Sequence, residues 1–309
     1  MARPTQIGNE AQVIVTQASE ARDSRVRSLL RGFRRDARWW FSIVLLLFVL
    51  AAIFAPLVSP YDPLAYHPSI LEQPPSWAHL LGTDDLGRDQ LSRVIYGTRI
   101  SLSIGVISIL MGGLAGVLLG ILAAYFKGWV DQAVTIIVDA LLAFPSLILA
   151  LAIVASLGPS LVNVAVALAI VRIPIYARLA RGQTLQVATQ DYVAAAHGLG
   201  TKTTRILMRH ILPNIFSPLL VQATISISFA ILDESVLSFL GLGAQPPTPE
   251  WGSMITEAQP FIFSDPWMLL GPALAIVLVL LSLNIVGDAL RDRLDPRDAR
   301  QLVMPFRKS

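Results

Sequence analysis

The chain has 309 residues, of which 54% are hydrophobic and only 15% are charged. Soluble domains carry about 25% charged residues, so this composition excludes an ordinary soluble protein and predicts that lipid surrounds most of the fold. The net charge of +3 does not indicate a nucleic-acid partner, because the basic residues lie at the edges of long apolar runs instead of forming one stripe. The chain has no cysteine, which excludes disulfides and thiolate metal sites.

Six apolar runs are long enough to cross a membrane, since about 20 helical residues span about 30 Å of hydrocarbon. The first run is too long for the apolar core of a secretory signal and is expected to be a retained helix. Pro145 and Pro174 fall inside two runs, where neighbouring helices can satisfy the freed backbone groups, so we expect kinked helices there. The six predicted spans are residues 39–58, 101–125, 130–157, 161–180, 215–240 and 267–286.

The segment before the second run, residues 59–98, begins rich in proline, which favours irregular backbone. Its last part, residues 86–98, has mixed polarity and is expected to form a short helix near the membrane surface.

Lys and Arg are unevenly shared among the segments outside the spans, and such basic segments are typically cytoplasmic. The loop 242–266 has neither residue. The sequence therefore predicts an all-α integral membrane protein with a domain at residues 38–290 and with both termini cytoplasmic. The basic segments are the N-terminal tail 1–37, the loop 181–213 and the C-terminal tail 291–309.

No energy-converting or catalytic motif is found in the sequence. The nearest match to a phosphate-binding loop, residues 198–203, lacks the required Gly-Lys pair. The four histidines have no ligand spacing, and no serine lies in a Gly-x-Ser-x-Gly elbow. We therefore predict no catalytic residue, no metal site and no cofactor, and any transport must draw energy from another chain or from an ion gradient.

The loop 181–213 is the most informative segment. Asp191 is expected to cap a short alanine-rich helix, and Gly198 and Gly200 are expected to end it. A second, basic helix then runs towards Pro213. Small side chains permit close approach by another protein surface, so the first helix is interpreted as a docking element. The alternative is a helix lying on lipid headgroups.

The string Ala194–Gly200, followed by His210–Pro213, resembles the EAA loop of bacterial ABC-importer permeases. In that family the loop forms the coupling helix, which sits in a groove on the ATPase subunit. Two positions depart from the family pattern, with Ala194 where glutamate is common and His210 where isoleucine is common. The resemblance implies ATPase contacts at Tyr192, Ala194, Ala195, Ala196, Gly198, Gly200, Leu212 and Pro213.

Three further strings, at residues 79–89, 237–252 and 284–297, resemble the dipeptide, oligopeptide and nickel permeases, specifically the "C" member of their permease pair. This resemblance implies the type I ABC-importer permease fold and a channel-forming subunit that imports di- or oligopeptides. It implies as partners a second permease subunit in a heterodimer, one or two ATPase subunits, an extracytoplasmic binding protein and the lipid of a bacterial plasma membrane.

Two alternatives stay open. Relatives of the same family import nickel or glutathione. An ion-coupled secondary transporter is a different class, but many such transporters have internal repeats, and none is visible here. A membrane enzyme is disfavoured by the lack of a catalytic constellation.

Three acids lie inside predicted spans, where charged residues usually face the bundle interior or a wet cavity. Asp139, Asp233 and Glu234 are therefore candidates for a translocation path. Glu234 matches a recurrent family position and is the preferred candidate, whereas a helix–helix hydrogen bond is the simpler interpretation of Asp139. Asp233 and Glu234 lie about 100° apart on a helix and cannot form a facing pair.

Two other groups of residues have alternative interpretations. Asp84, Arg88, Asp89 and Trp251 lie in the outer segments and are expected either to dock a binding protein or to cap the bundle. Glycines recur every four residues in the second span and predict close packing against another helix, in this chain or in a second permease. These glycines are Gly112, Gly116 and Gly120.

Overall fold

The computed structural model describes residues 38–294. The predicted N-terminal tail, and residues 295–309 of the predicted C-terminal tail, lie outside the described residues. Five helices are long and apolar enough to span a membrane, and a sixth candidate is a pair of helices bent by 89°. Over the described residues the chain forms helices and an isolated β-bridge between Thr83 and Asp89, with no strand. The predicted all-α membrane fold is thus confirmed.

After the N-terminal helix Arg38–Val58 and an irregular segment, the elements follow one another with short connections. They are α2 (Gln90–Phe126), α3 (Gly128–Leu142), α4 (Ser146–Leu157), α5 (Leu161–Ala188), α6 (Asp191–Gly198), α7 (Thr203–Ile206), the π-helical turn η1 (Leu207–Ile211), α8 (Leu212–Phe239), α9 (Trp251–Ala258), the 3₁₀ turn η2 (Gln259–Phe261) and α10 (Trp267–Leu294).

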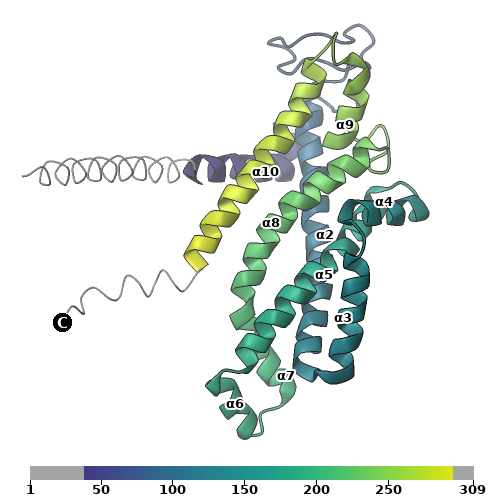
Figure 1. Ribbon diagram of the computed structural model, residues 1–309. Helices are drawn as coiled ribbons and strands as arrows, with labels where there is room; N and C mark the ends of the chain where they lie inside the picture. The colour runs from purple at the N-terminus through teal and green to yellow at the C-terminus, as the bar shows by residue number, and fades with distance from the viewer. Residues whose placement is uncertain (1–37, 295–309) are drawn as a thin grey trace, which may run out of the picture.

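The long helices α2, α5, α8 and α10 run along the molecule, as Figure 1 shows. The short helices α6 and α7 lie at one end, which we call the α6 end. The irregular segment 59–89 and α9 lie at the opposite end, which we call the α9 end. The two segments that the sequence singled out for docking are therefore separated by the full length of the bundle.

The third predicted span, residues 130–157, is a broken helix. Two helices, α3 and α4, replace it and meet at residues 143–145 with a bend of 89°. Pro145 explains the break, because a residue that precedes proline is disfavoured in the α conformation. Pro174 lies within the unbroken α5, so the kink expected there does not interrupt the helix.

The second predicted span begins eleven residues earlier than expected. Residues 90–98 are the first turns of α2, so the separate surface helix predicted at 86–98 is wrong. The helix starts where the Asp89 carboxylate accepts the backbone N–H of Ser92 at 2.8 Å. The polar residues of its first turns, such as Arg93 and Thr98, are buried against the α9 end and therefore do not interrupt the helix.

The glycine face of α2 packs against α5 of the same chain. A Cβ atom at Gly112 would lie 2.2 Å from the Ala169 carbonyl oxygen, and one at Gly120 would lie 2.3 Å from the Ala177 carbonyl oxygen. At Gly116 a Cβ would lie 2.5 Å from the carbonyl oxygen of Ile173. These contacts assign the glycine repeat to packing within this subunit.

The N-terminal helix crosses α10 at a steep angle in Figure 1. Leu45, Phe48 and Ala52 pack against the buried cluster around Trp251. Arg38, at its start, forms an ion pair with Asp292 near the end of α10. The rest of the helix presents exposed leucine, isoleucine and phenylalanine side chains, as expected of a lipid-facing segment.

We predict that Gly116→Ala destabilises the fold, because the added methyl group would overlap the backbone of α5. Overpacking of this kind costs about 1–3 kcal/mol. The melting temperature of the purified protein in detergent measures the effect. Gly182→Ala on α5 is the matched control, since a Cβ there meets nothing within 4 Å. A wild-type melting temperature for Gly116→Ala would contradict the close helix contact.

Candidate functional site

The predicted coupling helix is α6, which lies at the exposed α6 end of the molecule (Figure 1). Val193 is buried and packs into a cluster formed with residues of α2, α5 and α8, and this contact anchors the short helix. Ala194 and Ala195 are exposed, and Ala196 is half-buried. The outward surface of α6 therefore has small side chains at Ala194 and Ala195, beside the exposed Tyr192 and His197.

Both ends of α6 have clear local causes. The helix begins one residue earlier than expected, with Gln190 as the N-cap and Asp191 in the first turn, where a negative charge favours the helix N-terminus. It ends at Gly198, and Gly200 adopts the left-handed conformation with φ of 72°. The Thr201 N–H donates to the Ala196 carbonyl at 3.1 Å and closes the turn. The predicted glycine terminus is confirmed.

A π-helical turn connects α7 to α8. The Leu212 N–H donates to the Leu207 carbonyl five residues earlier, and Pro213 follows with no N–H to donate. The side-chain amide of Asn214 donates to the backbone carbonyl of His210 at 2.6 Å. This hydrogen bond satisfies a carbonyl within the distorted turn. Ile206 and Ile211 are fully buried. The connection between the coupling loop and α8 is therefore a well-packed joint, beside which Leu212 is half-buried and Pro213 exposed.

The charged residues of the α9 end form a buried network. The Arg88 guanidinium donates to Asp84 at 2.6 Å and to Glu257 at 3.0 Å. Arg93 donates to the same Glu257 oxygen at 2.7 Å. Asp84 also accepts the N–H groups of Leu86 and Arg88. This network ties the irregular segment to α2 and α9.

The other two docking candidates also point inward. Asp89 caps α2 and contacts the His79 ring at 2.9 Å. The Trp251 indole N–H donates to the Val94 carbonyl at 3.1 Å, and its ring fills the space beside Gly97. Asp84, Arg88, Asp89 and Trp251 are each no more than 4% exposed, so all four shape the α9 end from inside.

The path candidate Glu234 is buried at the junction of α8 and α9. It is 0% exposed, as is Glu250, the residue that precedes α9. Glu250 accepts the N–H groups of Gly252 at 2.6 Å and Ser253 at 2.9 Å. The Ser238 hydroxyl lies 3.4 Å from the Glu234 carboxyl. Glu234 therefore faces the interior of the fold.

Burial raises the pKa of the Glu250 carboxyl, while the two N–H groups at the start of α9 oppose this shift. The Glu250 carboxyl lies in contact with that of Glu234, so the two acids are buried together at the junction of α8 and α9. Glu250 is missing from the sequence-based expectations, because it lies in a loop segment and only the fold brings it to Glu234.

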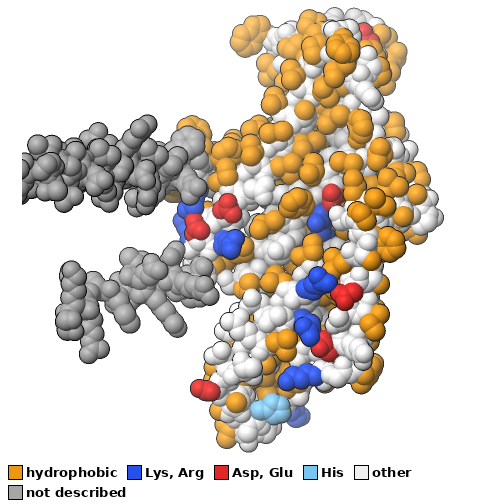
Figure 2. All heavy atoms as spheres, viewed as in Figure 1, with side chains coloured by type: hydrophobic (Ala, Val, Ile, Leu, Met, Phe, Trp, Pro, Cys, Tyr) orange, Lys and Arg blue, Asp and Glu red, His pale blue; other side chains and the backbone are white. Residues whose placement is uncertain are grey.

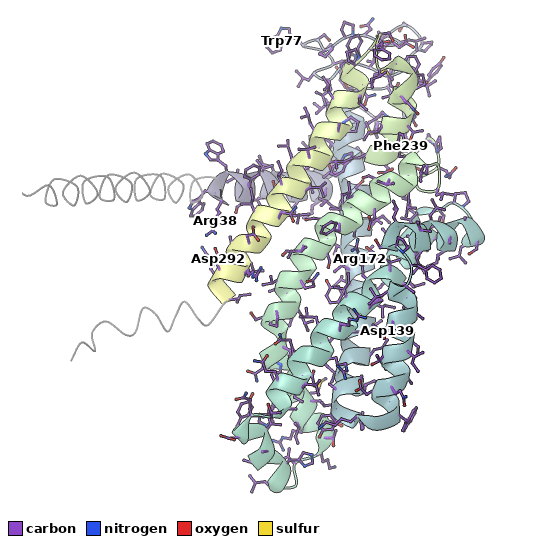
Figure 3. All side chains as sticks on the ribbon, viewed as in Figure 1. Arg38, Trp77, Asp139, Arg172, Phe239 and Asp292 are labelled. Carbon is purple, nitrogen blue, oxygen red and sulfur yellow. The ribbon has the colours of Figure 1, made fainter. Side chains whose placement is uncertain are left out.

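The other two path candidates form ion pairs with arginines of α5. Asp233 on α8 pairs with Arg172, and Asp139 on α3 pairs with Arg178 at 2.7 Å. Figure 3 labels Asp139 and Arg172, which extend from neighbouring helices in the middle of the molecule. Asp233 and Glu234 point to different neighbours, as their helical spacing predicted. The sequence did contain a signal for this pairing. An arginine inside an apolar run, such as Arg172, requires an acidic partner nearby.

Among the described residues, no group of three His, Asp or Glu side chains is placed to hold a metal ion.

Residues 116–299 match the family described as binding-protein-dependent transport system inner membrane component. Residues 24–75 match the N-terminal transmembrane domain of oligopeptide transport permease C. The chain belongs to the family of binding-protein-dependent transport system inner membrane components, the permeases of ABC importers. The type I permease fold and the multi-pass membrane location expected from the sequence are confirmed.

Similar proteins include a di/tripeptide transport system permease of Pseudomonas aeruginosa, 47% identical over 82% of this chain and 86% of its own. A dipeptide permease of Alkalihalophilus pseudofirmus is 46% identical, over 82% and 84%. A glutathione permease of Pectobacterium atrosepticum is 45% identical, over 89% and 94%. The inward-facing MetNI methionine ABC transporter shares the fold, with a TM-score of 0.54 and 19% identity over 65% of this chain and 96% of its own.

We predict that Glu257→Ala destabilises the protein, because the buried Arg88 and Arg93 lose one of the two carboxylates that they share and keep the other, Asp84. Loss of a hydrogen bond to a charged group costs about 1.5–3 kcal/mol. Thermal unfolding of the purified protein measures the loss. Asp292→Ala is the matched control: it breaks the Arg38–Asp292 pair, whose side chains are 40% and 55% exposed, and exposed pairs contribute about 0–1 kcal/mol. Equal losses in both variants would refute the buried network.

We predict that Glu234→Ala lowers the amount of folded protein and the uptake of substrate in parallel. Loss of the buried carboxyl removes its contact with Ser238 and leaves a gap beside Glu250, at a cost of about 1–3 kcal/mol. Glu234→Gln should retain both properties, because an amide can donate to the Glu250 carboxylate. Membrane abundance and uptake are compared in the same vesicles. If uptake falls while abundance is unchanged, Glu234 contacts the substrate after all.

Proposed function

We propose that this chain is the channel-forming permease subunit of an ATP-driven importer of di- or oligopeptides. The proposed cargo class rests on the relatives at 45–47% identity. Their names specify dipeptides, di/tripeptides and glutathione. Glutathione is itself a small peptide, so the three names share one chemistry. Each of these relatives aligns with at least 82% of this chain.

Energy for transport comes from separate ATPase subunits that dock on the α6 end. The exposed Ala194 and Ala195, with Tyr192, Gly198 and Gly200 around them, support this proposal, because small side chains let another surface approach the helix backbone. Tyr192 is 45% exposed, and its ring centroid lies 6.0 Å from that of His210. An ATPase bound at α6 would therefore lie next to the π-helical turn. This turn continues directly into Leu212, Pro213 and the rest of α8.

The α6 end faces the cytoplasm, and both termini lie on that side. Its basic residues support this orientation, as does the ion pair that joins Arg38 to Asp292, near the two ends of the described chain. Residues 38–290 form one permease domain between cytoplasmic tails. A second permease subunit completes the passage as a heterodimer in the plasma membrane of a bacterium.

An extracytoplasmic binding protein docks on the α9 end. Asp84, Arg88, Asp89 and Trp251 serve this role indirectly, by holding the irregular segment and α9 in one shape. Direct contacts come from their exposed neighbours, among which Trp77 is 98% exposed and Phe263 is 99% exposed. Trp77 is labelled at the α9 end in Figure 3.

The test is reconstitution of the chain with its second permease, ATPase subunits and binding protein in proteoliposomes. We expect ATP-dependent accumulation of a labelled dipeptide, with competition by unlabelled dipeptide. Ala195→Trp should abolish both accumulation and co-purification of the ATPase, because the indole would occupy the docking surface.

Val162→Trp is the matched control, as it adds the same side chain at a 71% exposed position far from α6. Retention of the ATPase by Ala195→Trp would refute docking at α6. Accumulation of a nickel complex but of no peptide would refute the proposed peptide substrate and would still support an ATP-driven importer.

A further inference from the structure

Three ion pairs join α5 to its neighbours. Arg172 pairs with Asp233 of α8. Arg178 pairs with Asp139 of α3 at 2.7 Å, and Arg181 binds both carboxylate oxygens of Asp131 at 2.6 and 2.7 Å. Figure 2 shows a column of acidic and basic side chains down one face of the molecule, leading towards the α6 end.

The middle pair lies open in a hollow between α3 and α5. Arg178 is 60% exposed and Asp139 is 55% exposed. The hollow has a volume of about 360 Å³, and Thr135, Arg181 and Gly182 also line it. An open ion pair within a membrane domain is costly in contact with lipid, and such residues normally face a bundle interior or a water-filled cavity. This surface is therefore suited to face water or another protein subunit.

The broken helix leads independently to the same conclusion. Residues 143–145 are exposed and non-helical between two apolar helices. Non-helical backbone at membrane depth occurs only where protein covers it or where it lines a water-filled cavity. Asp139 lies about one helical turn before the break, so the break and the open ion pair belong to one surface.

We propose that this hollow is a transient binding site for the charged termini of a zwitterionic peptide in a water-filled passage. The inference rests on the proposed function and names the groups that hold the cargo. Asp139 accepts the ammonium group, and the Arg178 guanidinium binds the terminal carboxylate, for which its planar fork is suited. Because the peptide supplies one charge of each sign, both side chains exchange partners and no charge is left unpaired.

The neighbouring pair explains how a peptide would leave the hollow. Arg181 lies three residues after Arg178, which is about 4.5 Å along the helix, and its pair with Asp131 is less exposed than the middle pair. A second pair of the same charge pattern lies within reach on the side of the α6 end. The sites are alike and adjacent, so each one can bind a terminus without trapping it.

Thiol labelling of the complete importer in proteoliposomes tests whether the hollow is wet. The chain has no cysteine, so Thr135→Cys introduces its only thiol, inside the hollow. The control is Leu114→Cys, at a 65% exposed position on α2. With a charged thiol reagent on both sides, we expect the first variant to react at least about tenfold faster, because the reactive thiolate forms in water and not in lipid.

Excess dipeptide should slow labelling of Thr135→Cys and leave Leu114→Cys unaffected. Equal rates for the two variants without peptide would overturn the wet passage, and labelling that ignores the peptide would overturn the binding site. These outcomes are independent of whether wild-type transport works. An importer that fails to accumulate any peptide refutes the proposed function, even where the hollow is accessible.

Substitution of the pair tests the chemistry. Asp139→Asn and Arg178→Gln should each lower dipeptide uptake about fivefold, the ratio expected for loss of one exposed ionic contact. Membrane abundance should be unchanged. Arg38→Gln, which removes an exposed ion pair outside the hollow, is the matched control. Wild-type uptake in both hollow variants, or losses of uptake that only match losses of abundance, would overturn the site.

Discussion

The contact between α2 and α5 is the one on which the other elements depend. Glycines of α2 lie directly against carbonyl groups of α5, and no side chain separates the two backbones. Van der Waals contact of this kind is a principal source of helix association in lipid, where apolar burial offers little driving force between helices. Helix α5 in turn contacts α3, α4 and α8, so the positions of its three ion pairs with α3 and α8 follow from its packing on α2.

The two ends of the bundle are built differently. At the α9 end, a network of buried charges and the indole of Trp251 tie an irregular segment to α2 and α9. At the α6 end, a short helix is anchored by Val193 and exposes alanines. Helix α8 connects the two ends, since it begins at the π-helical turn and reaches the Glu234–Glu250 pair. The two ends are therefore joined by one continuous helix.

The charges inside the apolar helices divide into two kinds. Glu234 is enclosed with Glu250 and two serines, Ser101 and Ser238, at the junction of α8 and α9. The arginine–aspartate pairs of α5 lie on a surface, where the pair of Asp139 and Arg178 is open. Both kinds satisfy the rule that charge in an apolar environment must be paired or hydrated. Only the second kind is available to a passing molecule.

The sequence by itself determined which segments are apolar helices, where α6 ends, and the family to which the chain belongs. Composition, helical length and glycine conformation are local properties, so short stretches of sequence are enough to predict them. The sequence did not determine that the third span is broken, that the polar residues 90–98 continue α2, or that the expected docking residues are buried. Those features depend on which side chains meet across the bundle, as Glu257 meets Arg93 and Asp139 meets Arg178. Only the tertiary structure decided them, because the energy of a charge in a membrane protein depends on the partner that packing brings to it.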